Sequence, residues 1–200
     1  MKRQTLDKFF VVAGLALAFT LLALALVLRS NASFAKNYVR DQLSAQAITF
    51  TPKAGLNDAE QKAICLVNNA GKPLLSGPQA ECYANEYIAG HLKVVNAGKT
   101  YSQSSSEARK LRTEAADAVT QGASNAQQLG DTATKAEAQV ETLFRGETLR
   151  GLLLTSFGFS EFGRKASQAA DVALLAAFVL LLAGIAGGVH ASRAKGELVD

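Results

Sequence analysis

Two long apolar runs dominate the pattern of hydrophobic and polar positions along the 200-residue chain. Residues 9–28 form a run of twenty that only Thr20 interrupts, and residues 172–189 form an uncharged run of eighteen. A helix rises about 1.5 Å per residue, so about 17–25 apolar residues are needed to cross a hydrocarbon core about 30 Å thick. The pattern therefore predicts two transmembrane helices.

Each run also has an alternative interpretation. The basic start of the chain and Ser30-Asn31-Ala32 after the first run resemble a signal peptide, although this run is longer than such a peptide needs. The second run could be a core helix of a soluble protein, but a helix that is apolar on all sides needs a large protein around it. Two retained spans are therefore the interpretation that we favour.

Basic residues beside the runs predict the orientation. They stand at both ends of the chain: Lys2, Arg3, Lys8, Arg193 and Lys195. Such flanks are typical of cytoplasmic ends, and a long loop between two spans is translocated largely regardless of its charge. We expect a plasma-membrane protein with cytoplasmic tails at residues 1–8 and 190–200 and an extracytoplasmic domain at residues 29–168.

Both cysteines of the chain, Cys65 and Cys82, fall within this predicted extracytoplasmic domain. A lone pair in an exported domain is typical of a disulfide, and two buried free thiols are the alternative. A metal site is a third interpretation, but His91 is the only histidine nearby and the CxxC spacing of zinc ligands is absent. We expect a disulfide and no metal or other cofactor.

The region between the spans has mostly helical periodicity. We expect the first helix to continue to near Ile48, and a short extended segment near 48–52 to follow. A helix from Asn57 or Asp58 to Asn69 and another over residues 78–98 come next. The predicted fold is mainly α, with two transmembrane helices flanking an extracytoplasmic helical bundle.

Residues 103–148 are expected to form a long helical hairpin. Its seam is made mostly of small residues at alternating steps of three and four: Leu111, Ala115, Val119, Gly122, Ala126, Leu129, Ala133, Ala136, Val140 and Leu143. Gly130-Asp131 is the expected break, since glycine often ends a helix and aspartate often begins one. One long helix over residues 111–143 is the alternative.

The stretch 146–166 contains four glycines, and Ser160 is a candidate N-cap for a last helix that leads into the second span. Its apolar residues suggest a joint close to the membrane. We expect Leu149, Leu152 and Leu153 to pack against the domain, and Phe157, Phe159 and Phe162 to lie at the membrane interface. A dedicated partner site is the alternative.

Small residues within the spans favour close packing of the two helices on each other or on a partner. Gly14 and Ala18 in the first span, and Gly184 and Gly188 in the second, have the small-xxx-small spacing that lets helices approach closely in lipid.

The sequence offers little chemistry. It contains no Gly-rich phosphate loop, zinc-protease motif, serine-hydrolase motif or EF-hand, and His91 and His190 are predicted on opposite sides of the membrane. Between residues 30 and 168 there are fifteen basic and thirteen acidic residues, which is not the concentrated positive charge of a nucleic-acid-binding protein. We expect neither an enzyme nor a nucleic-acid partner.

Four stretches resemble a family of uncharacterised actinobacterial membrane proteins with two spans. They are YVRDQLSAQAITFTP, CLVNNAGKPLLSGPQAECYANEYIAGHLK, GKTY and ETLFRGETLRGLLLTSFGFSEFG. The resemblance implies an integral membrane protein of a cell envelope, with Cys65 and Cys82 inside shared motifs. It implies no activity, substrate or site.

Two functions remain open. In the first, the protein is a structural, accessory or docking component that contacts the bilayer and another membrane or envelope protein, or a second copy of itself. In the second, its extracytoplasmic domain binds a ligand and signals. Because only eleven residues follow Val189, a sensor of this kind would need a separate membrane partner.

Overall fold

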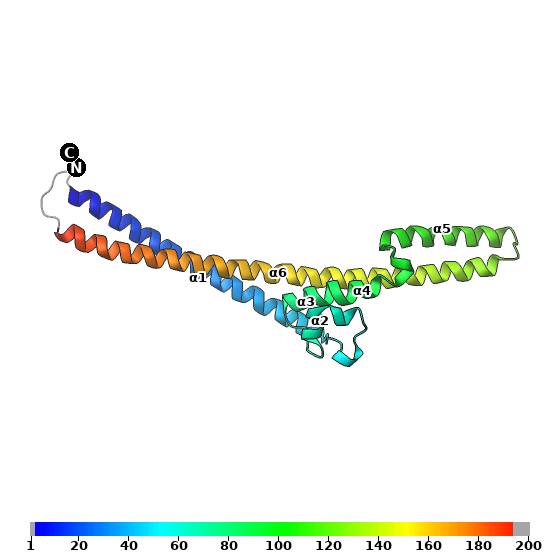
Figure 1. The fold of residues 1–200 in the computed structure, drawn as a ribbon. Helices are drawn as coiled ribbons and strands as arrows, with labels where there is room; N and C mark the ends of the chain where they lie inside the picture. Colours follow the sequence, from blue (N-terminus) through cyan, green and yellow to red (C-terminus); the bar gives the residue numbers. More distant parts are fainter. Residues whose placement is uncertain (1–2, 194–200) are drawn as a thin grey trace. The chain divides into compact units, whose positions relative to one another are not determined.

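A computed structural model describes residues 3–193 (Figure 1). Helices account for 85% of the structure, and no strand occurs within residues 3–193, which confirms the mainly-α class. The chain divides into two compact units. One consists of Met1–Tyr38 with Glu161–Asp200, and its described part is called the apolar pair here; the other, Val39–Ser160, is called the helical domain.

The two apolar runs lie in the two longest helices, α1 (Arg3–Ala45) and α6 (Ala126–Arg193). Both helices are long and apolar enough to cross a membrane. Within the apolar pair they lie side by side and run in opposite directions (Figure 1). The expected tails at residues 1–8 and 190–200 fall partly outside the described residues.

Helix α6 runs without interruption through the four glycines of the stretch 146–166, and Ser160 lies inside it. The N-cap expected at Ser160 is therefore wrong. Close packing explains two of these glycines. A Cβ on Gly146 would come within 2.5 Å of Leu92, and one on Gly163 within 2.8 Å of the Ala35 Cβ.

After α1, the chain forms the short extended contact that the sequence predicts. Thr49 and Pro73 form an isolated antiparallel bridge. The Phe50 amide donates to the Lys72 carbonyl at 3.0 Å, and the Leu74 amide donates to the Ile48 carbonyl at 2.9 Å. Gly71 allows the chain to return to this contact, because it adopts a left-handed conformation with φ 71°.

Short helical elements build the first half of the helical domain. Single turns of 3-10 helix at Lys53–Gly55 and Glu60–Lys62 precede α2 (Ile64–Asn69). The helix expected from Asn57 therefore starts later, although Asn57 caps the turn at Glu60: its side-chain oxygen accepts from the Ala59 and Glu60 amides, both at 2.9 Å.

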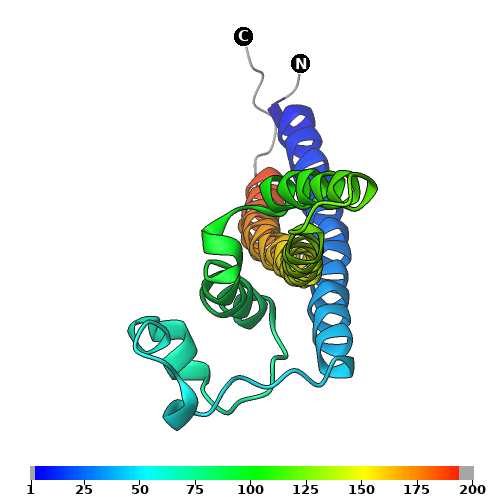
Figure 2. The same ribbon diagram turned by 90° about the vertical axis from the view of Figure 1, so that its right-hand side faces the viewer.

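The next helix has three parts, which are α3 (Gly77–Cys82), a π-helical turn (Tyr83–Ile88) and α4 (Ala89–Leu92). It ends before the expected residue 98, because the chain turns over Val95–Gly98. In that turn Asn96, Ala97 and Gly98 all have positive φ. Figure 2 shows α3 and α4 on one side of α6.

A hairpin of α5 (Tyr101–Thr120) and the first part of α6 completes the domain. Its break lies at residues 121–125, not at Gly130-Asp131. Gly122, with φ 63°, ends α5 in a Schellman motif, in which the Ala123 amide donates to the Ala118 carbonyl at 2.9 Å. Gly122 is thus a terminator rather than a seam residue, and Val119 is 67% exposed.

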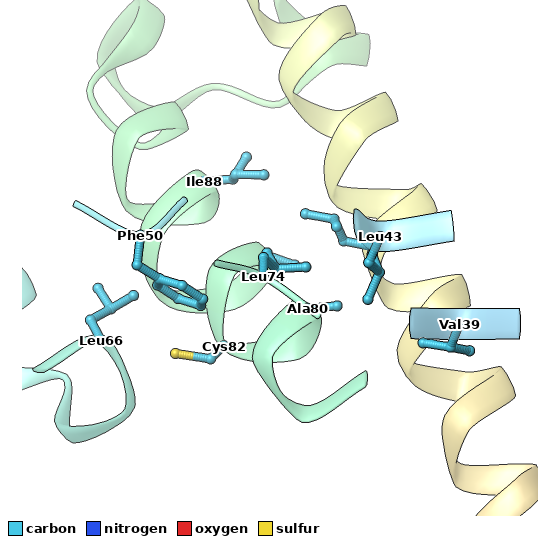
Figure 3. Close-up of a cluster of buried hydrophobic side chains, with 10 residues drawn as sticks. Val39, Leu43, Phe50, Leu66, Leu74, Ala80, Cys82 and Ile88 are labelled. Atoms are coloured by element: carbon cyan, nitrogen blue, oxygen red, sulfur yellow. The ribbon is translucent and has the colours of Figure 1, made fainter. Parts of the chain in front are cut away.

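One hydrophobic cluster joins both ends of the helical domain. Its buried members come from α1, the extended segment, α2, α3, the π-helical turn and α6: Val39, Leu43, Phe50, Leu66, Leu74, Ala80, Cys82, Ala84, Ile88 and Leu153. Figure 3 shows Leu74 and Ala80 between Leu43 and Phe50. These long-range contacts fix the short helices in place.

Candidate functional site

The apolar pair has a seam of small residues with a seven-residue period. Buried seam residues lie on α1 at Ala18, Ala25 and Ala32, and on α6 at Gly163, Ala170, Ala177, Gly184 and Ala191. A Cβ on Gly184 would come within 2.7 Å of the Leu15 Cδ2, so the helices are in close contact there. A heptad period keeps one face of each helix against its neighbour along the whole pair.

Large apolar side chains point away from this seam. Within the two apolar runs, residues 9–28 and 172–189, eight from each are exposed: Phe9, Phe10, Val12, Leu17, Phe19, Leu24, Leu26 and Val27 on α1, and Val172, Leu174, Leu175, Phe178, Val179, Leu182, Ile185 and Val189 on α6. Of the most apolar stretch of α1 only 11% is buried, and of the most apolar stretch of α6 only 17%. The core helix of a soluble protein is mostly buried, whereas these two stretches are mostly exposed in the structure.

Polar groups mark the limits of the apolar surface. Arg29 follows the first run and Asp171 precedes the second, and the Arg29 Nη1 donates to the Asp171 Oδ1 at 2.5 Å. Both side chains are more than half exposed, so the pair adds little stability but aligns one end of the two runs. Within the first run, the Thr20 hydroxyl donates to the Ala16 carbonyl at 3.0 Å and needs no other partner.

The four small residues predicted to pack have different environments. Ala18 and Gly184 are seam residues. Gly14 and Gly188 are only partly buried, and a Cβ on either would meet no atom within 4 Å. The small-xxx-small spacing therefore predicted only two of the seam residues. The seven-residue repeat of small residues, mostly alanine, would have predicted the whole seam.

Cys65 and Cys82 form a disulfide, with a Cα–Cα distance of 6.0 Å. It joins α2 to α3, so the expected link between two helices of the domain is confirmed. Cys82 is also part of the buried cluster. The disulfide therefore secures α2, a helix of six residues that contributes Leu66 to that cluster.

The apolar stretch of α6 is divided between the core and the surface. Leu153 is buried in the cluster, and Phe157 is half-buried next to Gly77. Leu149 and Leu152, which we expected to pack against the domain, are 39% and 63% exposed. Phe159 and Phe162 are exposed, at 39% and 76%. The core thus uses the side of α6 that carries Leu153, while Leu152, Phe159 and Phe162 keep more than a third of their surface exposed.

A buried carboxylate, absent from the sequence prediction, lies beside a ladder of aromatic rings. Glu60 is 7% exposed, and its Oε2 accepts from the Asn57 amide at 2.9 Å. Its Oε1 lies 3.5 Å from the Nε2 of His91, whose Nδ1 faces the Tyr87 carbonyl at 2.9 Å. The spacing Asn57-x-x-Glu60 is the signature of a capping box and could have revealed this contact.

Three rings follow one another along the same helix at four-residue spacing. The ring centres of Tyr83 and Tyr87 are 4.7 Å apart, and those of Tyr87 and His91 are 4.4 Å apart. Burial raises the pKa of Tyr83, and the neighbouring Tyr87 adds to the increase. The hydroxyl of Tyr83 therefore stays protonated at neutral pH.

A polar clamp holds the start of α5. The Lys99 Nζ donates to both carboxylate oxygens of Glu107, at 2.8 and 2.7 Å. The Asn96 amide group donates to the same carboxylate at 3.2 Å and to the buried Ser104 hydroxyl at 2.9 Å. These bonds, that of Lys99 first, lower the pKa of Glu107. Thr100 and Gln103 complete a capping box at the same helix end.

No group of three or more His, Cys, Asp or Glu side chains is placed to hold a metal ion within residues 3–193. No family model, no curated protein and no solved structure matches the chain.

Proposed function

We propose that the protein is a two-pass integral membrane protein that displays its helical domain on the oxidising, extracytoplasmic side of the plasma membrane. There it acts as a non-enzymatic docking or accessory component of the cell envelope. The observation that supports the proposal best is the inverted packing of the apolar pair, with alanine and glycine inside and large apolar side chains outside.

The energy of the outward side chains favours a bilayer. Moving a large apolar side chain out of water stabilises it by about 1.5–3 kcal/mol. Sixteen such side chains, eight from each apolar run, face outward. Because only about half of each side chain is exposed, the sum is about 12–24 kcal/mol. It matches or exceeds the roughly 5–15 kcal/mol by which a typical domain is stable, so this surface needs lipid or protein around it.

Charge and redox chemistry support the orientation. Lys8 and Arg193 lie at the same end of the apolar pair, opposite the end where Arg29 meets Asp171. Basic ends are typical of the cytoplasmic side. The disulfide of the helical domain fits an oxidising compartment, because cytosolic thiols are normally kept reduced.

Extraction of membranes with alkaline carbonate tests insertion. We expect the full chain to remain in the membrane pellet, as an integral protein does. A matched variant with Leu24→Lys and Phe178→Lys places charges on the lipid-facing surface and should be lost from the pellet. Release of the unaltered chain by carbonate would contradict the proposal.

Docking is supported by apolar side chains that the helical domain leaves exposed. Ile64, Val94 and Val119 are 76%, 81% and 67% exposed, and Phe144 is 51% exposed. A photo-crosslinking residue at Val119 or Ile64 should give discrete crosslinked products in native membranes. The same residue at Asp131, an exposed polar position, should not. The absence of products from both apolar positions would count against docking.

A further inference from the structure

Two grooves lie between α1 and α6 in the apolar pair, near its basic end. The first, about 300 Å³, is lined by Asp7, Gly14 and His190 among others, and is called the acidic groove. The second, about 240 Å³, is lined by Lys8, Gly188 and Ser192 among others, and is called the basic groove. Val11 borders both, so the grooves lie on the two sides of the contact between the helices.

Each groove contains a glycine that the pair itself does not need. A Cβ on Gly14, in the acidic groove, or on Gly188, in the basic groove, would meet no atom within 4 Å. Neither has a positive φ. Glycine inside a helix costs about 1 kcal/mol relative to alanine. These glycines leave room for the close approach of a further helix.

The grooves carry opposite charges at the same depth. Asp7 and His190 are the titratable residues that line the acidic groove, and Lys8 lines the basic groove. The Oδ2 of Asp7 is buried and has no hydrogen-bond partner among the described residues. Because Asp7 also lines the groove, a cationic group placed in the groove would pair with its carboxylate.

We propose that the occupant of the acidic groove is the basic-groove face of a second copy of this chain. The copies stand parallel in one membrane, and the Lys8 ammonium of one lies beside the Asp7 carboxylate of the next. Asp7 and Lys8 are adjacent in sequence, so two copies inserted in the same orientation bring them to the same depth. The inference rests on the proposed membrane insertion.

This contact is heterologous: one face meets a different face of the neighbour. A two-fold dimer through either groove would instead place Asp7 against Asp7 or Lys8 against Lys8, and like charges repel. Each copy in the proposed contact keeps one groove free, so the contact can repeat into a row or ring of copies.

Crosslinking between two tagged copies tests the arrangement. One copy carries Gly14→Cys and the other Gly188→Cys, while Cys65 and Cys82 remain tied to each other. Oxidation in native membranes should give a dimer that contains both tags, and neither variant expressed alone should give a dimer. Ala13→Cys with Val189→Cys, at neighbouring exposed positions, is the matched control and should give none.

Charge exchange gives a second test on the same pair of variants. Asp7→Lys in both copies should abolish the crosslinked dimer, and adding Lys8→Asp should restore it, because the opposite charges then face each other again.

A dimer from either single-cysteine variant alone, or one that persists with Asp7→Lys, would overturn the inference. The chain must stay in the carbonate pellet throughout: pelleted protein without the dimer overturns the inference alone, whereas release from the pellet overturns the proposed function as well.

Discussion

Gly77 begins α3 at a point where α3 touches α6. A Cβ at this position would overlap the Cβ of Ser160 and would lie 3.3 Å from the Cα of Phe157. The obstacle is the backbone and Cβ of a helix, which cannot move aside as the end of a long side chain can. This glycine therefore sets the distance between the two helices.

Gly77→Ala should destabilise the helical domain by about 1–3 kcal/mol, the usual cost of overpacking. The full chain in detergent can be followed by thermal or chemical denaturation. Gly151→Ala is the matched control, because Gly151 lies in α6 with nothing within 4 Å of its Cβ; it should raise stability by up to about 1 kcal/mol. Equal effects of the two substitutions would refute this account of Gly77.

Glu107 gives the start of α5 a dependence on pH. Its pKa is lowered in the folded chain, so its bonds to Lys99 and Asn96 favour folding above the pKa of the unfolded chain, near 4.5. That contribution is lost as the pH falls through the lower, folded value. We expect faster amide exchange around Ser104 below about pH 4.5, after correction for the intrinsic rate.

Glu107→Gln should remove this dependence, because the amide does not titrate in that range. Glu114→Gln is a suitable control, since Glu114 forms an i,i+4 ion pair with Lys110 at 3.7 Å and lies further along the same helix. An acid-induced change that persists in the Glu107→Gln variant would show that another group is responsible.

At the scale of single residues, local hydrogen-bond partners could be predicted from the sequence better than the burial of a side chain. Asn57 or Asp58 was expected to begin a helix, and Asn57 caps the turn at Glu60. The burial of Glu60 depends on His91, thirty-one residues later, and on a π-helical turn that no local pattern indicates. Such contacts require the fold before they can be recognised.

Among the elements, the seam of the apolar pair depends on the size of its residues. Ala177 is fully buried, whereas its neighbour Phe178 is 58% exposed. Ala177→Leu should separate the helices and lower the melting temperature in detergent or lipid, because a small residue is needed where two helices touch. Phe178→Leu, a change on the outward face, should have little effect, and an equal loss in both variants would contradict the seam.

The disulfide should matter for the short helices more than for the long ones. Replacing Cys65 and Cys82 together by serine should cost about 3 kcal/mol, as expected for a loop of this length. Chemical denaturation of the full chain under non-reducing conditions measures the loss. The apolar pair should remain helical in the variant, because the disulfide joins only α2 and α3. An unchanged unfolding midpoint would show that the cluster alone holds α2 in place.

Glycine was the main source of error in the predicted elements. Gly130 was expected to end a helix, yet Gly122 does so and Gly130 lies inside α6. Both residues follow runs with similar periodicity, so local sequence does not separate them. Gly146 and Gly163 also lie inside α6, where they permit contacts with Leu92 and Ala35, residues remote in sequence. A glycine that packs and a glycine that breaks a helix look alike without the partner.

For the whole molecule, the parts that the sequence predicted best are those fixed by composition. The two apolar runs lie in two long helices, because an uncharged apolar run of twenty or eighteen residues is too long for a typical strand or loop. The arrangement of the short helices around Phe50 and Leu74 depends on packing between distant segments. No periodicity within a single segment contains that information.

Thiol labelling tests the proposed topology most directly, because it reports on which side of the membrane each unit lies. Lys135→Cys places a thiol on the exposed surface of the helical domain, and Ser192→Cys places one near the basic end of the apolar pair. On intact cells, a membrane-impermeant maleimide should label the Lys135→Cys variant at once and the Ser192→Cys variant only after the cells are opened. Labelling of both variants on intact cells, or of the Ser192→Cys variant alone, would contradict a two-pass protein with an extracytoplasmic helical domain.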